Sequence, residues 1–171
     1  ARSKSLYLTV RNACACVTDR PFVGDAARIR QILVNLTGNA IKFTETGGVT
    51  IGIACHHDDK ADTEDLVFTV TDTGIGIAGD KLGLIFNKFS QADSSINRKY
   101  GGSGLGLSIA RSLTEAMGGA IAASSEAGRG STFTVTLPLP RAEPGAAGRE
   151  GTTTGGLAPH QATRLLLVED S

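Results

Sequence analysis

The sequence predicts a domain of the α/β class. Two segments, near 26–43 and 103–117, repeat apolar residues at the three- and four-residue spacing of amphipathic helices. Shorter segments in which apolar and polar residues alternate, as in half-buried strands, precede, separate and follow these helices. The chain has 171 residues, of which 40% are hydrophobic. This composition suits one domain with its own core and an additional tail.

The first strand and the first helix have clear signals. Residues 6–10 alternate apolar and polar side chains and predict a strand. Asp25 precedes the first helical segment, and its carboxylate suits an N-cap. On a helical projection of about 100° per residue, the apolar residues of this segment fall within about 60° of one direction. The expected core face consists of Ile29, Ile32, Leu33, Leu36, Ala40 and Phe43.

A hairpin and a long irregular segment follow. Strands are predicted at 49–53 and 66–71, with a turn-rich loop at 56–65 between them. Residues 74–102 have few signals of regular structure beyond a short apolar run at 82–86. An irregular segment of this length inside a domain is typical of a functional lid or of a disordered stretch. The second helix is predicted from Ser103 to the Gly118-Gly119 pair.

Two strands and a tail complete the chain. Residues 120–124 and 131–137 predict strands, and Pro138 and Pro140 are expected to end the second one. Residues 141–163 are rich in Gly, Ala, Thr and Pro and predict a flexible linker. Residues 164–171 predict a strand that opens a further domain. The expected domain therefore covers 1–140.

Composition excludes some function classes. Lys plus Arg and Asp plus Glu both total 17, so the chain has no basic surplus for nucleic acid. No apolar run approaches the roughly 20 residues of a membrane span, so no direct membrane contact is expected. The chain lacks an initiator Met, so it is expected to be a piece of a longer protein. Its three cysteines are expected to be reduced, buried thiols.

A polar stripe borders the apolar face of the first helix. Asn35, Asn39 and Lys42 stand at i, i+4 and i+7, so they share one edge of the helix. A carboxamide oxygen can ligate Mg²⁺, and an ammonium group can neutralise phosphate. Taken alone, the stripe also fits an ordinary solvated helix face.

Two glycine-rich segments carry further chemistry. Asp72-Thr73-Gly74-Ile75-Gly76-Ile77 follows a strand, where a carboxylate can accept a hydrogen bond from an exocyclic amine; an ordinary turn is the alternative. Residues 101–107, GGSGLGL, lead into a helix, and free backbone N–H groups there favour a phosphate cradle. The dinucleotide-binding spacing at 74–79 lacks the helix and acid that must follow it, and no GxxxxGK[ST] loop is present.

In this order and spacing, the segments resemble the catalytic ATP-binding domain of sensor histidine kinases, in the gyrase–Hsp90–histidine kinase–MutL superfamily. NLTGNAIKFT resembles the N box, DTGIGI the first glycine box, IFNKF the phenylalanine box and GGSGLGL the second glycine box. The resemblance runs from about Leu6 to Pro140. It implies a two-layer α/β sandwich, with a mixed, mostly antiparallel sheet packed on helices and ATP between the helices and a flexible lid.

The resemblance also implies site residues. Asn39 would ligate Mg²⁺ with Asn35 beside it, Lys42 would contact phosphate, and Asp72 would accept a hydrogen bond from the adenine amino group. The lid would span about 78–102, with Phe86 and Phe89 as anchors. Asn35, Lys42 and Arg98 are the implied catalytic residues. The other implied nucleotide contacts are Asn39, Phe43, Asp72, Gly74, Gly76, Ile77, Phe89, Lys99, Gly102, Gly104, Leu105 and Gly106.

The implied activity is that of a protein histidine kinase, which transfers the γ-phosphoryl group of Mg-ATP to a histidine. None of His56, His57 and His160 stands in a helical phosphoacceptor pattern, so the acceptor is expected on a separate dimerising helical hairpin. Superfamily members that hydrolyse ATP carry glutamate at the position of Asn35, and an amide cannot act as a general base. An ATP-hydrolysing clamp and a non-catalytic nucleotide-binding module are the alternatives.

The last residues resemble a second domain type. LLLVEDS resembles the first strand of a receiver domain, with Glu169 and Asp170 as its acidic pair. The resemblance implies a hybrid kinase whose hairpin and receiver domain are partners of this segment in the same parent. It also implies a cytoplasmic location and leaves open a parent anchored in the inner membrane.

Overall fold

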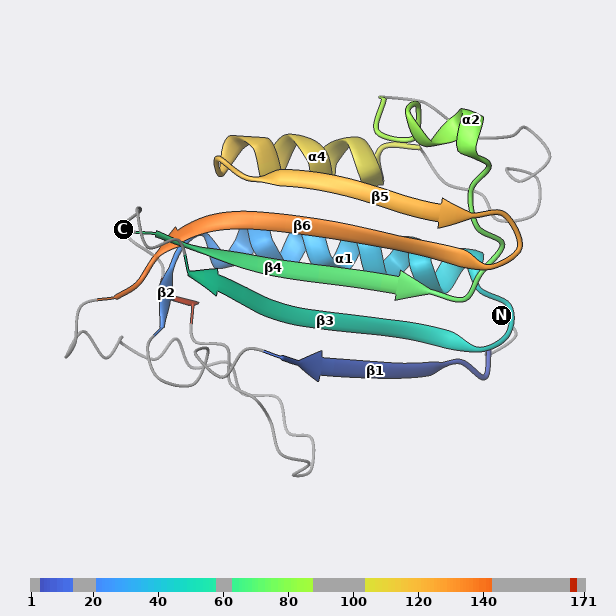
Figure 1. The fold of residues 1–171 in the computed structure, drawn as a ribbon, viewed down its shortest axis with the longest axis horizontal. Helices are drawn as coiled ribbons and strands as arrows, with labels where there is room; N and C mark the ends of the chain where they lie inside the picture. Colours follow the sequence, from blue (N-terminus) through green and yellow to red (C-terminus); the bar gives the residue numbers. More distant parts are fainter. Residues whose placement is uncertain (1–3, 14–20, 58–62, 88–103, 143–166, 169–171) are drawn as a thin grey trace.

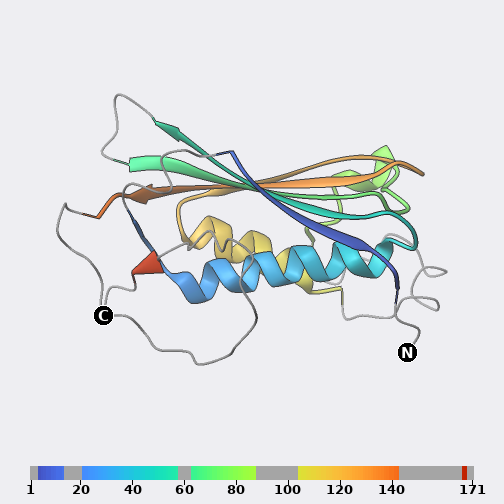
Figure 2. The same cartoon turned by 90° about the horizontal axis from the view of Figure 1, so that it is seen from below.

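A computed structural model of the chain describes residues 4–13, 21–57, 63–87, 104–142 and 167–168. In this part, five strands form one sheet, in the order β1-β3-β4-β6-β5. Their bounds are β1 Tyr7–Asn12, β3 Gly48–His57, β4 Thr63–Asp72, β5 Ala120–Glu126 and β6 Gly130–Pro140. β1 pairs with β3 in parallel, and the other neighbours are antiparallel. Helices α1 (Ala26–Phe43) and α4 (Gly106–Ala116) cover one face of the sheet (Figures 1 and 2). The predicted two-layer α/β class is confirmed.

Helix α1 forms as the sequence predicts. The Asp25 carboxylate accepts a hydrogen bond of 2.9 Å from the Arg28 N–H and caps the first turn. The helix ends at Thr44, whose N–H and hydroxyl both donate to the Ala40 carbonyl. Four residues of its apolar face are buried against the sheet: Ile29, Ile32, Leu36 and Ala40. Leu33 is partly buried beside them.

Helix α4 begins later than predicted and ends where predicted. Gly104 has φ +70°, which a right-handed helix does not accommodate, so the regular turns start only at Gly106. At the other end Gly118 has φ +74°, and the Gly119 N–H donates to the Thr114 carbonyl. This left-handed glycine after the last turn is the common way to end a helix.

The hairpin of β3 and β4 has a shorter loop than predicted. The register runs from Val49 opposite Asp72 to His57 opposite Glu64, so both strands continue into the segment expected to be a loop. The reason is that side chains in these two segments still alternate between the faces of the sheet, although most of them are polar and read as a loop in the sequence. Cys55 and Leu66 still pair on the helix-covered face, where both contact the core, while His56 pairs with Asp65 one residue further along.

The prediction that Pro138 and Pro140 end the last strand is correct for Pro140 and wrong for Pro138. β6 continues through Pro138 and ends at Pro140, and the two prolines pair with Asp65 and Thr63 of β4. The pairing of β5 with β6 stops at Thr136, so beyond that residue β6 is a sheet edge on the β5 side. Proline is tolerated where its missing N–H would face such an edge.

One apolar core lies between the sheet and the helices. Its largest fully buried apolar side chains come from α1, from the start of β3 and from alternate positions of β4 and β6, which face the helices. They are Ile29, Ile32, Leu36, Val49, Leu66, Phe68, Val70, Val135 and Leu137. Helix α2 (Gly79–Leu82) leads into Ile85 and Phe86, and the Phe86 ring meets Phe133 edge-on at 6.4 Å. The expected anchoring role of Phe86 fits this contact.

A second, small sheet lies near the start of α1. β2 (Phe22–Val23) pairs in parallel with β7 (Leu167–Val168), within the tail predicted to be a strand. The Ala142 N–H donates to the Pro21 carbonyl, and Ala142 is buried. The ordered fold therefore extends past the predicted boundary at Pro140. The division into a linker and the start of a receiver domain stays a prediction.

The prediction of reduced cysteines is wrong for Cys55. This residue packs against the core on β3 and is disulfide-bonded. An odd cysteine count prevents complete pairing but permits one bridge. Cys14 and Cys16 lie outside the described residues.

Candidate nucleotide site

The amide edge of α1 faces the first turn of α4. Asn35 and Asn39 are half-buried on this edge. A β-carbon added to Gly106 would lie 3.6 Å from Asn39 Nδ2 and 4.0 Å from Asn35 Oδ1. Gly106, near the end of the second glycine segment, thus lies directly beside the two carboxamides, and a β-carbon there would make only ordinary van der Waals contacts with them. Two of the three predicted clusters are therefore neighbours.

Asn35 has an unsatisfied amide group. Its Nδ2 atom is buried and makes no hydrogen bond within the described part of the protein. Buried polar atoms are nearly always paired, and leaving one unpaired costs about 1–3 kcal/mol. Such an orphaned group beside a helix start is typical of a site that a polar ligand completes.

The third cluster lies at the opposite end of α1 from its N-cap. Asp72, the last residue of β4, is 6% exposed. Its Oδ1 accepts hydrogen bonds from the Gly74 N–H at 2.8 Å and the Ser131 N–H at 3.3 Å. Burial raises the pKa of the Asp72 carboxyl above its ordinary value of 3.8, while the hydrogen bonds from Gly74 and Ser131 oppose that shift. The side chain is thus a fixed, desolvated acceptor.

Glycines hold this loop against its neighbours. A β-carbon on Gly74 would come within 2.5 Å of the Phe43 carbonyl oxygen. Gly76 has φ +65°, and a β-carbon there would come within 2.0 Å of the Glu126 carbonyl oxygen. The expectation that these glycines give a base room is untested. The packing of the protein itself already requires both of them.

The end of α1 is bonded to this loop. The Ile75 N–H donates to the Phe43 carbonyl at 3.2 Å, which ties the last helical residue to the glycine loop. The Lys42 ammonium lies over the Phe43 ring, 4.8 Å from its centroid. Lys42, Phe43 and Asp72 therefore form one connected group at the α1–β4 end of the site.

The start of α4 suits an anion. Its N-cap residue, Leu105, makes no side-chain capping bond, and the first turn contains no acidic residue. Free N–H groups and the positive end of the helix dipole therefore meet the Asn35–Asn39 edge without a competing carboxylate. The phosphate cradle at Gly104, Leu105 and Gly106 stays a prediction.

Part of the predicted site falls on residues that are not described. Phe89, Arg98, Lys99 and Gly102 belong to this group. Ile77 is described, and its N–H donates to Ser125 Oγ at 2.8 Å. Ser125 and Ser131 support the loop and Asp72, and the sequence reasoning missed them. A serine near the end of a strand carries no specific sequence signal. The roles of Ser125 and Ser131 follow from the strand register, which places them opposite each other on β5 and β6.

The donor set fits a magnesium nucleotide better than a metal held by protein alone. The described residues contain no group of three His, Cys, Asp or Glu side chains placed to hold a metal ion. Mg²⁺ is commonly bound through one or two protein oxygens together with substrate phosphates. The carboxamide oxygens of Asn39 and Asn35 are of the ligand type that suits that role, and the unpaired Asn35 Nδ2–H group can donate to a phosphate oxygen. In the described ranges, no helix is long and apolar enough to cross a membrane.

Comparison with known proteins identifies the family. A family profile described as "Histidine kinase-, DNA gyrase B-, and HSP90-like ATPase" matches residues 24–141. The chain belongs to this ATPase family. Curated relatives include the circadian input-output histidine kinase CikA of Synechococcus elongatus, 47% identical over 117 residues, which are 68% of this chain and 15% of CikA. The sensor protein GacS of Pseudomonas syringae is 46% identical over 119 residues, covering 70% of this chain and 13% of GacS.

Solved histidine kinases share the fold of this ATPase domain. Full-length ShkA in complex with AMPPNP superposes with a TM-score of 0.65 and 35% identity, over 81% of this chain and 26% of ShkA. The catalytic domain of histidine kinase ThkA gives a TM-score of 0.56 and 26% identity, over 78% of this chain and 80% of that domain. The chain thus spans about one seventh of the curated relatives CikA and GacS. It is a histidine kinase-type ATPase domain of the two-component sensor kinases.

Proposed function

We propose that this domain binds Mg-ATP and transfers the γ-phosphoryl group to a histidine of a separate dimerising helical hairpin in the same parent protein. The observation that carries the proposal is the convergence of three segments. Asn35 and Asn39 adjoin Gly106, and Phe43 is bonded to the loop that begins at Asp72. ShkA, which shares 35% identity with this chain, was solved with AMPPNP.

In this proposal the adenine binds at the Asp72 end of the site. The Asp72 carboxylate accepts a hydrogen bond from the exocyclic amine and so selects adenine over guanine, which presents a carbonyl oxygen there. Phe43 borders the base, and the loop of Gly74, Gly76 and Ile77 runs beside it. The buried position of Asp72 supports this role, because a desolvated acceptor discriminates strongly between a donor and another acceptor.

The phosphates bind between α1 and α4. Backbone N–H groups at Gly104, Leu105 and Gly106 donate to phosphate oxygens, and Lys42 neutralises charge. Asn39, with Asn35 beside it, holds Mg²⁺, which when bound screens the charge on the phosphates. Arg98, Lys99, Phe89 and Gly102 complete the site in the proposal, although they lie outside the described residues.

Transfer requires a nucleophile from outside this domain. The acceptor imidazole nitrogen bonds to the γ-phosphorus while the bond to the β,γ-bridging oxygen breaks, and ADP leaves. Asn35 is an amide and cannot remove a proton from water, so the site is built for transfer rather than for rapid hydrolysis. The fixed N–H groups and Lys42 stabilise the charge on the transferring group.

Titration of the 171-residue protein with ATP, with and without Mg²⁺, tests the binding half of the proposal. We expect calorimetry to show ATP binding that Mg²⁺ strengthens, and GTP to bind at least about tenfold more weakly because of Asp72. Absence of ATP binding would overturn the proposal.

Addition of the phosphoacceptor hairpin of the parent tests the transfer half. The protein alone is expected to stay unlabelled by γ-labelled ATP, and the added hairpin is expected to gain acid-labile label. Rapid ATP hydrolysis by the isolated protein would favour the clamp alternative, and binding without labelling of the hairpin would favour a nucleotide-binding module. We further propose a cytoplasmic location and a receiver domain as a second partner.

A further inference from the structure

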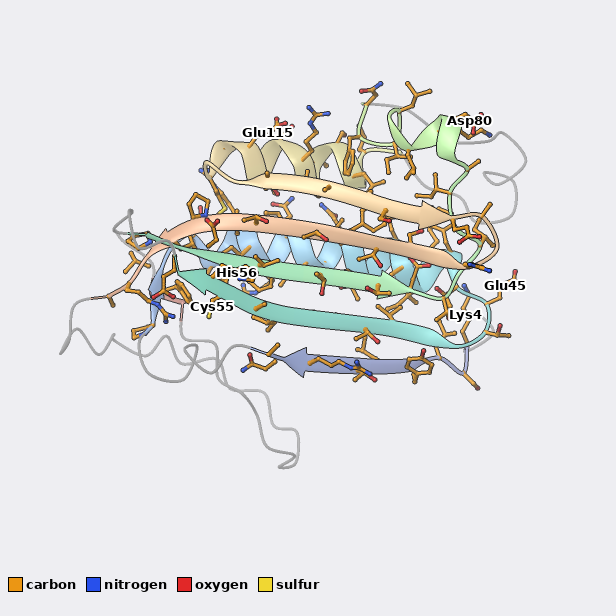
Figure 3. All side chains as sticks on the ribbon, in the orientation of Figure 1. Lys4, Glu45, Cys55, His56, Asp80 and Glu115 are labelled. Carbon is orange, nitrogen blue, oxygen red and sulfur yellow. The ribbon has the colours of Figure 1, made fainter. Side chains whose placement is uncertain are left out.

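We infer that Lys4 is a positioning residue of the nucleotide site, because it fixes the C-terminal turn of α1 on which Lys42 and Phe43 stand. Lys4 precedes β1 and lies outside every predicted motif. Figure 3 labels it at the end of the molecule where α1 leads into β3, near Glu45. This inference rests on the proposed function.

The Lys4 ammonium binds the end of α1 through three hydrogen bonds. Its Nζ donates to the Ile41 carbonyl at 3.0 Å, the Lys42 carbonyl at 2.8 Å and the Thr44 carbonyl at 2.8 Å. An ammonium group has three protons to donate, and all three have an acceptor here. The last carbonyls of a helix have no partner within the helix, so an external donor fixes their position.

Every carbonyl of this turn has a named partner. The Ala40 carbonyl accepts from Thr44, and the Phe43 carbonyl accepts from the Ile75 N–H of the Asp72 loop. Lys4 satisfies the remaining three. The end of α1 is thus held by the nucleotide loop on one side and by Lys4 on the other. Loss of either partner frees the turn that carries Lys42 and Phe43.

The segment around Lys4 lies beside the same turn. Lys4, Leu6, Tyr7, Leu8, Ile41 and Val49 line one shallow pocket between β1, α1 and β3. The Tyr7 N–H also donates to the Gly47 carbonyl in the α1–β3 turn. The Tyr7 bond fixes the backbone three residues after Lys4 beside the helix end, and the three Nζ bonds fix the other end of the Lys4 side chain.

Lys4 also acts through charge. Its ammonium stands at the negative end of the α1 dipole, on the turn that carries Lys42 and Phe43. Removal of the charge leaves the three carbonyls that accept from Lys4 without a counter-charge. Both effects, position and charge, lower the affinity for ATP and leave the core of the domain intact.

The test compares Lys4→Met with Lys4→Arg and with Arg11→Met, an equal loss of charge at an exposed position of β1. We expect the Kd for Mg-ATP to rise about three- to tenfold in Lys4→Met, to recover largely in Lys4→Arg and to stay unchanged in Arg11→Met. Titrations are made well below the Tm of each variant, so a change in stability alone does not alter the Kd. Amide hydrogen exchange should quicken at Thr44 and Ile75 in Lys4→Met only.

The outcomes separate this inference from the function on which it rests. If the unmodified protein binds Mg-ATP and Lys4→Met binds it equally well, the positioning role is wrong. If no variant binds ATP but exchange at Thr44 and Ile75 quickens in Lys4→Met, the structural link stands and the proposed function fails. If Lys4→Met and Arg11→Met weaken binding equally, the effect is one of net charge and the positioning role is again overturned.

Discussion

At the residue scale, Asp72 is subject to opposing demands. A buried carboxylate destabilises the fold, yet the proposed adenine contact needs that acceptor in place. In Asp72→Asn the amide oxygen still accepts from Gly74 and Ser131, but the buried charge is gone. We expect unfolding at neutral pH to show equal or greater stability for the variant, while calorimetry shows ATP binding weakened by about tenfold or more. Lower stability together with unchanged ATP affinity would make Asp72 a purely structural residue.

The stability difference at Asp72 should depend on pH. Burial raises its folded-state pKa above the ordinary 3.8, so the folded protein binds a proton there more tightly than the unfolded chain does. The stabilising contribution is complete below 3.8 and is lost as the pH rises through the raised folded-state pKa. The advantage of Asp72→Asn should therefore be largest at neutral pH and shrink on acidification. Urea unfolding at several pH values measures it, and a pH-independent difference would refute the assignment.

Asn35 is a second residue at which the proposed function lowers stability. Its buried, unpaired Nδ2 destabilises the protein, and leucine has nearly the same shape without a polar atom. We expect Asn35→Leu to raise the free energy of unfolding by about 1 kcal/mol and to remove most of the Mg²⁺ dependence of ATP binding. Calorimetry with and without Mg²⁺ checks the second point. Asn39→Ala should also remove the Mg²⁺ dependence without that gain in stability, because no unpaired buried atom is relieved there.

At the scale of elements, the glycine loop depends on its contact with the β5–β6 turn. Alanine at Gly76 would place a β-carbon within 2.0 Å of the Glu126 carbonyl oxygen and would keep the backbone at φ +65°. The left-handed backbone alone costs about 1–2 kcal/mol, and the clash adds to that. We expect Gly76→Ala to lower the Tm strongly. Gly79→Ala is the matched control, since nothing lies within 4 Å of its added β-carbon, and should change little. Equal Tm values would contradict the packing role.

The elements differ in how well the sequence predicts them. Helix α1 is predicted nearly to the residue, because the Asp25 cap and a strict apolar period act locally. The predicted start of α4 is three residues too early, because Gly104 adopts a left-handed backbone conformation. Any glycine can adopt or avoid this conformation, so the sequence alone does not predict it. The passage of β6 through Pro138 depends on where β5 begins, at Ala120 opposite Thr136, and the sequence around Pro138 does not contain that information. The same holds for the site: motifs identify Asp72 and Asn39, but Ser131 and Lys4 depend on strand register and helix-end geometry.

At the scale of the whole molecule, the two ends of the sheet have separate tasks. Asp72 is the last residue of β4, at the end of the sheet where the nucleotide is proposed to bind. Glu64 lies near the other end of β4, about 26 Å away at 3.3 Å per residue. There Arg141 donates to Glu64 Oε2 at 2.6 Å, with side chains 11% and 18% exposed. The Arg141 guanidinium also stacks over Phe22 at 3.8 Å. This cluster joins the end of β6 to the segment that leads into α1.

The Arg141 cluster predicts where the domain can be cut. A protein ending after Ala142 keeps this cluster and should lose only the β2–β7 pairing, with unchanged ATP affinity, whereas one ending after Pro140 should lose up to about 3 kcal/mol more, because the Arg141–Glu64 ion pair and the Ala142–Pro21 hydrogen bond go with it. Arg141→Ala should show the same loss in urea unfolding, and Glu64→Gln combined with Arg141→Met should recover part of it, since no unpaired charge is left. Because the proposed nucleotide site lies at the far end of the sheet, all of these variants should bind Mg-ATP with unchanged Kd below their Tm. If the loss of Arg141 weakens ATP binding while stability holds, the two ends of the sheet are coupled and this division of tasks is wrong.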